Sequence, residues 1–142
     1  PKMNDGASIM ALTYYGSTRY MQSYNVMGVA KAALETSIKY LAVDMGDRGI
    51  RVNAISAGPM RTLAGAVINK SRKIYNYTIE NSPIKKPLSL TDIGKSSVYL
   101  MSDLSKGVTG EILYVDNGYN KVGMSVQELW LEYSFFSKTV SY

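Results

Sequence analysis

Three short, mostly apolar runs recur along the chain, separated by longer segments that mix apolar and polar residues. The runs are SIMALTY at residues 8–14, IRVNAI at residues 50–55 and EILYV at residues 111–115. Short apolar runs with β-branched residues are typical of strands that are buried on both faces of a parallel sheet. The pattern therefore predicts three parallel strands, each covered on both sides.

The segments between these runs predict helices. Residues 23–45 contain strong helix formers, and Gly46 and Gly49 favour the end of a helix there. A second helix is expected from Thr91, as its N-terminal cap, to about residue 102. The alternation of strands and helices predicts an α/β fold with a parallel sheet and right-handed crossovers.

Composition indicates one globular domain and limits the chemistry available to it. The chain has 142 residues, 46% of them hydrophobic, which is enough for a core. It contains no cysteine and no histidine, which removes disulfides, thiolate metal sites and the commonest general base. We therefore expect no metal site, and any catalysis must use tyrosine, lysine, serine or a carboxylate.

Charge and hydropathy limit the binding partners and the cellular location that can be expected for the chain. The net charge of +5 is spread along the chain without a basic cluster interleaved with aromatic residues, so no nucleic acid partner is expected. No apolar run reaches the roughly 18 residues that span a bilayer, and the N-terminal segment lacks an apolar signal core. These features predict no membrane association and no secretion, and hence a cytoplasmic protein.

Tyr24 and Lys31 are the leading candidates for chemistry. They stand seven residues apart, so on one continuous helix they share a face about 10.5 Å apart, a gap that the backward-leaning lysine stem shortens. A protonated phenol can donate a hydrogen bond to an enolate, while the ammonium lowers the pKa of the phenol and can hold ribose hydroxyls. Taken alone, the pair also suits an exposed helix surface. Gly28 between them costs helix stability, which favours close contact with a flat cofactor ring or a packed helix.

The residues that follow the first two strands are further candidates, because open α/β sheets bind ligands outside the carboxyl ends of their strands. Tyr14 ends the first run, and SAGPMRT follows the second. Gly58 and Pro59 favour a turn, backbone groups around Met60 can pair with a carboxamide, and Thr62 offers a hydroxyl to a phosphate. An ordinary turn between a strand and a helix is the alternative for this segment considered alone.

Tyr14, Tyr24 and Lys31, followed by RVNAISAGPMRTLA at residues 51–64, resemble the bacterial enoyl-acyl carrier protein reductases, the hydride-transfer enzymes of type II fatty acid synthesis. The resemblance extends from about residue 3 to about residue 124. Most of the wider short-chain dehydrogenase superfamily has three residues between tyrosine and lysine, whereas six separate them here. A ketoacyl reductase of that superfamily is therefore not expected.

The resemblance implies a Rossmann-like, doubly wound parallel sheet. Residues 1–124 would form its C-terminal portion, with about three strands and flanking helices, because the glycine-rich loop that holds the cofactor pyrophosphate is absent from the chain. Residues 125–142 match nothing in the family. They are either an amphipathic helix, by their apolar spacing, or foreign sequence.

The resemblance also implies the roles of the site residues. Tyr24 would stabilise the enolate, Lys31 would hold the ribose and Tyr14 would flank the substrate. The cofactor would be NADH, with NADPH possible, and residues 63–77 would form a mobile lid. The residues expected to bind the cofactor are Lys31, Gly58, Pro59, Met60, Thr62, Leu63 and Ala64.

The implied function is reduction of trans-2-enoyl thioesters carried on acyl carrier protein. The small excess of basic residues is compatible with that acidic partner. By the same resemblance the full-length protein would be a homotetramer, and this chain alone would be an inactive half of the enzyme. The alternative is an inactive remnant of the fold that serves as a scaffold or binding module.

Overall fold

The computed structural model describes residues 3–62 and 71–123. The predicted tail at residues 125–142 and the start of the predicted lid lie outside these residues. In chain order the elements are β1 (Ser8–Thr13), η1 (Tyr15–Ser17), α1 (Val26–Asp44), η2 (Gly46–Arg48), β2 (Arg51–Ala57), α3 (Ser71–Asn81), α4 (Leu90–Met101), η3 (Asp103–Ser105), β3 (Ile112–Val115) and η4 (Tyr119–Lys121).

The three strands form one parallel sheet in the order β1-β2-β3, as predicted. In its register Thr13 lies opposite Ser56 and Ala57 opposite Val115, so all three strands end at the same edge of the sheet. Only the central strand β2 is buried along most of its length. The prediction of burial on both faces is wrong for β1, where Leu12 is 51% exposed, because β1 lies at the border of the described sheet.

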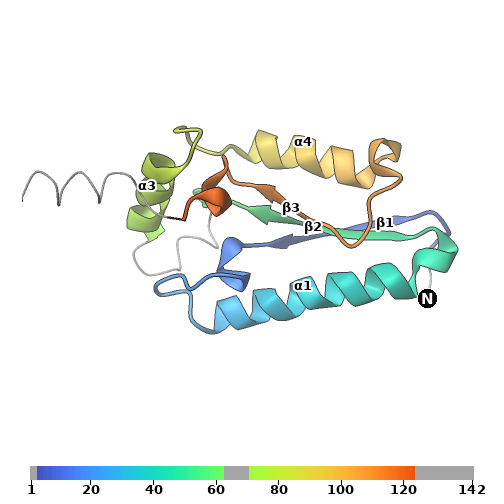
Figure 1. The fold of residues 1–142 in the computed structure, drawn as a ribbon. Coiled ribbons are helices and arrows are strands. Elements are labelled where there is room, and N and C mark those ends of the chain that lie inside the picture. The colour runs from blue at the N-terminus through green and yellow to red at the C-terminus, as the bar shows by residue number, and fades with distance from the viewer. Residues whose placement is uncertain (1–2, 63–70, 124–142) are drawn as a thin grey trace, which may run out of the picture.

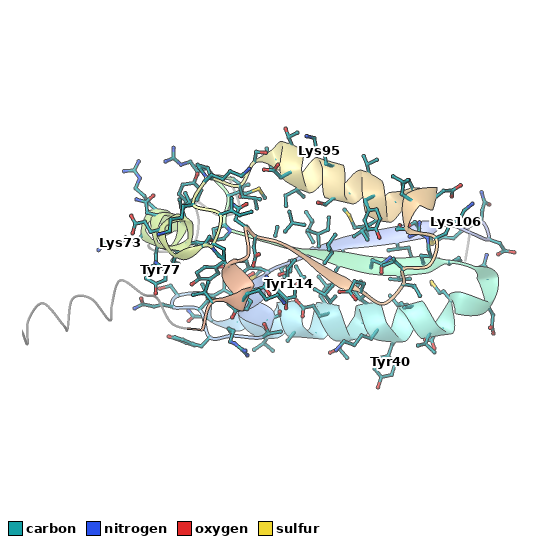
Figure 2. The ribbon with its side chains drawn as sticks, turned by 45° about the horizontal axis from the view of Figure 1, so that its top comes forward. Tyr40, Lys73, Tyr77, Lys95, Lys106 and Tyr114 are labelled. Carbon is teal, nitrogen blue, oxygen red and sulfur yellow. The ribbon has the colours of Figure 1, made fainter. Side chains whose placement is uncertain are left out.

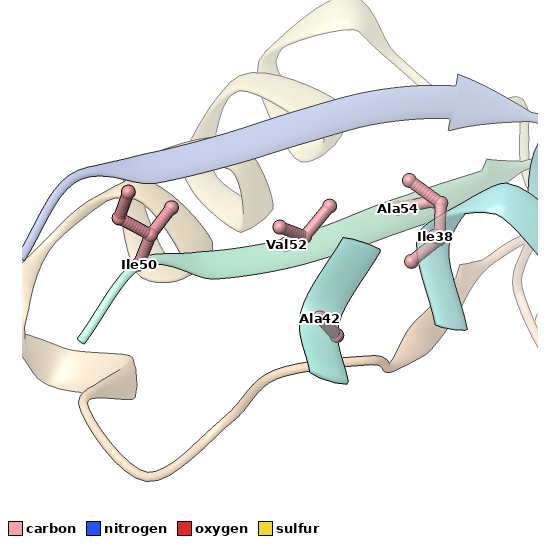
Figure 3. Packing of buried hydrophobic residues seen from close by; sticks show 5 residues of the cluster. All are labelled: Ile38, Ala42, Ile50, Val52 and Ala54. Carbon is pink, nitrogen blue, oxygen red and sulfur yellow. The ribbon is translucent and has the colours of Figure 1, made fainter. Parts of the chain in front are cut away.

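Helices cover both faces of the sheet (Figure 1). Ile38 and Ala42 of α1 pack against Ile50, Val52 and Ala54 on one face (Figure 3). On the other face, residues of α4 pack against the alternate side chains of β2, because successive residues of a strand point to opposite sides. The α/β, doubly wound character expected from the sequence is therefore confirmed.

The two crossovers of the sheet have opposite hands. Both connections step across the sheet in the same direction, yet the first passes α1 on one face and the second passes α4 on the other (Figure 1). The prediction that the crossovers are right-handed is therefore wrong for one of them. The second connection includes α3 as well as α4, so it is long enough to carry the chain around the carboxyl edge to the far face.

Helix α1 begins at Val26, three residues later than predicted. Ser23 and Asn25 have φ angles of 65° and 47°, which are incompatible with a right-handed helix. Tyr24 therefore lies in a turn before the helix. Further along, Figure 2 shows Tyr40 pointing away from the sheet, where it is 69% exposed.

Helix α4 is capped by Ser89, and the predicted cap at Thr91 is wrong by two residues. The Ser89 hydroxyl accepts the Asp92 N–H at 3.1 Å, and the Asp92 carboxylate accepts the Ser89 N–H at 3.0 Å. This reciprocal pair satisfies two backbone donors that the helix start leaves open. Hydrogen bonds from the Ser89 side chain and backbone hold the pKa of Asp92 below its ordinary value.

No described helix has the length and the apolar character needed to cross a membrane.

The two candidate caps can be separated by substitution. Ser89→Ala should lower the free energy of unfolding by about 1 kcal/mol, because it removes the side-chain acceptor at the N-cap. Thr91→Ala is the matched control: its side chain is exposed in the first turn of α4, so the change should stay within about 0.5 kcal/mol. Urea unfolding in one protein background compares the two. A larger loss with Thr91→Ala would contradict the assignment of Ser89.

Candidate active site

Two tyrosine rings meet at the carboxyl end of β1. Tyr14 follows the last residue of the strand in an extended conformation, and Tyr24 is turned inward by the positive φ angles of its two neighbours. The rings pack edge to face, with centroids 5.0 Å apart and planes at 68°, a favourable aromatic geometry. Only 9% of the Tyr24 surface is exposed.

These rings form one wall of a cavity of about 180 Å³ at the edge of the sheet where the strands end. The segment that follows β2 forms a second wall, and α3 closes a third. The cavity brings together residues from the ends of β1 and β2 that the sequence singled out. Its lining residues are Tyr14, Met21, Gln22, Tyr24, Gly58, Pro59, Met60, Thr62, Ile74 and Tyr75.

Four of these lining residues are not among the predicted site residues, although Ile74 and Tyr75 fall within the predicted lid at residues 63–77. Met21 and Gln22 belong to the loop before α1, and Ile74 and Tyr75 belong to α3. The loop carries no periodic pattern that could have indicated Met21 and Gln22. For α3, the family resemblance was the signal, because it predicted a lid over the substrate at residues 63–77. Leu63 and Ala64, which were predicted to bind the cofactor, lie outside the described residues.

Lys31 is not among the described residues that line the cavity. Its Nζ donates a hydrogen bond to the carbonyl oxygen of Leu12 at 2.9 Å, which places the ammonium beside the end of β1. The predicted geometry of two residues on one continuous helix is wrong, because Tyr24 precedes the helix. Tyr24 and Lys31 are instead both positioned against the strand end that leads into Tyr14.

Burial controls the ionisation of the two phenols. Removal from water raises the pKa of Tyr14 well above its ordinary value, and repulsion from the phenolates of Tyr119 and Tyr24 adds to the rise. Burial also raises the pKa of Tyr24. The prediction that the lysine lowers the pKa of the Tyr24 phenol is therefore wrong, because desolvation raises that pKa. Both hydroxyls are protonated at neutral pH and can act as hydrogen-bond donors.

Glycines permit two close contacts that shape the site. A Cβ on Gly28 would lie 2.8 Å from the carbonyl oxygen of Gly16, so α1 packs directly on the loop after β1. This contact supports the packing explanation for Gly28, with a loop in place of the expected helix. A Cβ on Gly58 would lie 3.0 Å from the Cα of Asp116, so the segment after β2 packs against the turn after β3.

The turn after β3 is itself held by a buried carboxylate. Asp116 is 6% exposed, and its oxygens accept the backbone N–H groups of Gly118 at 3.0 Å and Asn120 at 2.9 Å. These bonds stabilise the turn in which Asn117 and Gly118 have positive φ angles. The segment after β2 therefore packs, at Gly58, against a turn that is held by hydrogen bonds.

A parallel sheet wound on both faces, with a cavity outside the carboxyl ends of adjacent strands, is the arrangement of the open α/β proteins that bind nucleotide cofactors. Within residues 3–62 and 71–123 no group of three potential metal-ligating side chains occurs. The fold and site thus belong to the open α/β class, with two phenols in the cavity wall and the Lys31 ammonium beside the end of β1.

Comparison with known proteins identifies the family. The family described as Enoyl-(Acyl carrier protein) reductase matches residues 1–120, and the chain belongs to it. Enoyl-[acyl-carrier-protein] reductase [NADH] 1 of Rhizobium meliloti (strain 1021) is 60% identical over 122 residues, which cover 86% of this chain and 45% of the relative.

Solved structures show the same relationship. The enoyl-(acyl-carrier-protein) reductase of Anaplasma phagocytophilum, in complex with NAD, is 53% identical with a TM-score of 0.79 over 83% of this chain and 45% of that one. The Bacillus cereus enoyl-acyl carrier protein reductase with NADP+ and indole naphthyridinone is 48% identical, with a TM-score of 0.83 over 86% of this chain and 48% of that one. The chain thus spans about half the length of the proteins it matches.

The contact at Gly28 gives a test of the site's packing. Gly28→Ala should lower the free energy of unfolding by about 1–3 kcal/mol, because the new methyl group overlaps backbone that has little room to move. Gly94→Ala, inside α4, is the control: its Cβ meets nothing within 4 Å, so the better helix former should raise stability by up to about 1 kcal/mol. Opposite signs in thermal unfolding are expected. Stabilisation by both substitutions would refute the close contact.

Proposed function

We propose that the chain is the C-terminal, substrate-binding half of an enoyl-acyl carrier protein reductase, with residues 1–124 forming that part of the domain. The single observation that carries the proposal is the cavity in which two protonated tyrosines face the segment at residues 58–62. Phenols held in their neutral form by burial are suited to donate hydrogen bonds to an oxygen that becomes negative during reaction. Family membership supplies the substrate class, a trans-2-enoyl thioester on acyl carrier protein.

In this proposal Tyr24 is the electrophilic group. Its hydroxyl donates a hydrogen bond to the thioester oxygen, stabilises the enolate that forms there and supplies a proton. Tyr14 packs against Tyr24 and flanks the acyl chain, and its ring restricts the orientation of the Tyr24 phenol. When bound, the nicotinamide supplies the hydride that reaches the β-carbon.

The residues present fit one end of a dinucleotide. Lys31 has three N–H donors, of which the bond to Leu12 uses one, so its ammonium can also hold ribose hydroxyls at the strand end. Backbone groups around Met60 and the hydroxyl of Thr62 line the cavity wall and suit a carboxamide and a phosphate. The remaining candidates in this wall are Gly58 and Pro59. Leu63 and Ala64 lie outside the described residues and are candidates by the family resemblance alone.

The preferred cofactor in this proposal is NADH. The Rhizobium relative is named for NADH and the Anaplasma structure holds NAD, whereas the Bacillus structure holds NADP+. In this class of fold the residues that distinguish the two cofactors follow the second strand of the full sheet. Those residues belong to the part of the relatives that this chain does not cover, so NADPH remains the alternative.

The proposed partners are acyl carrier protein and further copies of the full-length protein in a homotetramer, in the cytoplasm. Exposed apolar side chains on α1 support association: Val29 is 70%, Tyr40 69% and Val43 80% exposed. Surfaces of this kind are suited to contact another chain or the remainder of the fold. The basic residues Arg72 and Lys73, the latter labelled in Figure 2, belong to α3, the helix whose Ile74 and Tyr75 line the cavity, and they suit an acidic carrier protein.

We propose as the second candidate function an inactive remnant of this fold that serves as a scaffold or binding module. The two candidates differ in one observable, which is turnover once the missing half is supplied.

The first test joins this chain to the part of the Rhizobium meliloti relative that it does not cover. This chimera should oxidise NADH when given an enoyl thioester, because the two halves together complete the cofactor site. Residues 1–142 alone should bind NADH and NADPH weakly, without turnover, since they reach only the nicotinamide end. Fluorescence titration and absorbance at the NADH band measure both. A folded chimera that binds NADH without turnover would favour the scaffold, and turnover by the isolated chain would contradict the half-enzyme assignment.

A second test separates the roles of Tyr24 and Lys31 in the chimera. Tyr24→Phe should lower kcat by about 10²-fold with little change in cofactor affinity, because it removes one donor to the developing charge. Lys31→Ala should also weaken NADH binding by about 10- to 100-fold, the effect of losing a charged hydrogen-bond donor. Steady-state kinetics and NADH titration give both quantities. Equal losses of NADH affinity in the two variants would overturn this division of roles.

A further inference from the structure

Two side chains on one face of α1 form hydrogen bonds with the last two residues of β1. Lys31 and Glu35 are four residues apart and therefore adjacent on the helix surface. Lys31 donates to the Leu12 carbonyl oxygen at 2.9 Å, and Glu35 Oε1 accepts the hydroxyl of Thr13 at 2.6 Å. The candidate ribose-binding lysine is thus one turn from a second bridge between the same helix and the same strand end.

The Thr13–Glu35 bridge is buried, unlike most polar contacts on α1. Thr13 is 4% exposed and Glu35 is 8% exposed. A separation of 2.6 Å is typical of a hydroxyl that donates to a carboxylate. The ion pairs within the described ranges join Arg48 to Asp5 and Lys106 to Asp103, so Glu35 is held by Thr13 and not by a nearby cation.

Burial of an acidic group is costly, and packing alone does not call for one here. Further along the same face of α1, Ile38 and Ala42 fill equivalent positions against β2. An apolar residue at position 35 would bury its surface without the desolvation cost of a carboxylate. The carboxylate therefore provides something that an apolar side chain does not, which is a directional bond to one residue of β1.

Thr13, the residue of β1 that bonds to Glu35, directly precedes Tyr14. We propose that Thr13 and Glu35 form a buried positioning pair, which sets α1 against the end of β1 and so fixes Lys31 relative to Tyr14 and the cavity. This inference rests on the proposed function. Neither residue lines the cavity, so neither is catalytic. The pair acts through geometry, and a misplacement of about 1 Å at a reacting group can cost about 10²-fold in rate.

The pair can be tested in the chimera with variants that separate geometry from stability. Thr13→Val and Glu35→Leu each leave one buried polar group without its partner, which should lower the melting temperature. Replacing both partners by apolar groups of similar shape can be nearly neutral for stability. The double variant should therefore recover much of the lost melting temperature. Because the directional bond is still absent, its kcat/KM should stay about 10- to 100-fold below the parent.

Two further variants complete the design. Glu35→Gln keeps a side-chain oxygen that accepts the Thr13 hydroxyl, so it should retain kcat/KM within about threefold of the parent, given the modest value of one hydrogen bond. Ser8→Ala is the matched control, because Ser8 donates to the Leu100 carbonyl oxygen from the other end and the other face of β1. It can change stability, but it should leave kcat/KM and NADH affinity unchanged.

A measurement without cofactor or substrate makes the test independent of activity. Amide hydrogen exchange at residues 12–17 should accelerate in the Thr13→Val variant and in the double variant, but not with Ser8→Ala. Faster exchange there, with impaired kcat/KM in the stable double variant, supports the pair. Recovery of kcat/KM together with stability, or unchanged exchange at residues 12–17, overturns it. An inactive parent chimera would count against the proposed function, while the exchange result would still decide the positioning pair.

Discussion

The parallel pairing of β2 with a strand on each side is the constraint on which the rest of the structure depends. Its register brings the ends of all three strands to one edge, and its burial requires a helix on each face. The cavity is a consequence of this arrangement, because its two main walls are the segments that follow β1 and β2. Side chains far apart in the sequence meet there because the pairing of β1 with β2 brings the ends of the two strands together.

Desolvation gives this cavity its chemical character. The closely packed rings of Tyr14 and Tyr24 exclude water from both phenols, which raises their pKa values and keeps the hydroxyls protonated. A neutral donor that is partly removed from water stabilises developing negative charge more strongly than it would in bulk water. The same exclusion of water makes the buried carboxylates of Glu35 and Asp116 depend on their hydrogen bonds, so polar groups near the site lock its geometry.

Two errors of prediction arise because local sequence signals do not settle where a helix begins. Thr91 and Ser89 are both good N-caps, and the reciprocal bond with Asp92 decides for Ser89. The helix formers after residue 23 predicted a helix that already includes Tyr24. Positive φ angles at Ser23 and Asn25 instead keep Tyr24 outside the helix, and its ring packs against Tyr14. The spacing of Tyr24 and Lys31 predicted a shared helix face, whereas the structure brings Tyr24 to the Tyr14 ring and Lys31 to the Leu12 carbonyl oxygen.

The sequence by itself determined the strands, the parallel α/β class, the family resemblance and six of the cavity's lining residues, because apolar runs and the SAGPMRT segment are local signals. Only the tertiary structure decided that α4 covers the face opposite α1, that Lys31 bonds to the end of β1, and that Thr13 meets Glu35. These features depend on packing between elements distant in the chain. Their energies come from burial and desolvation, which no local pattern of residues records.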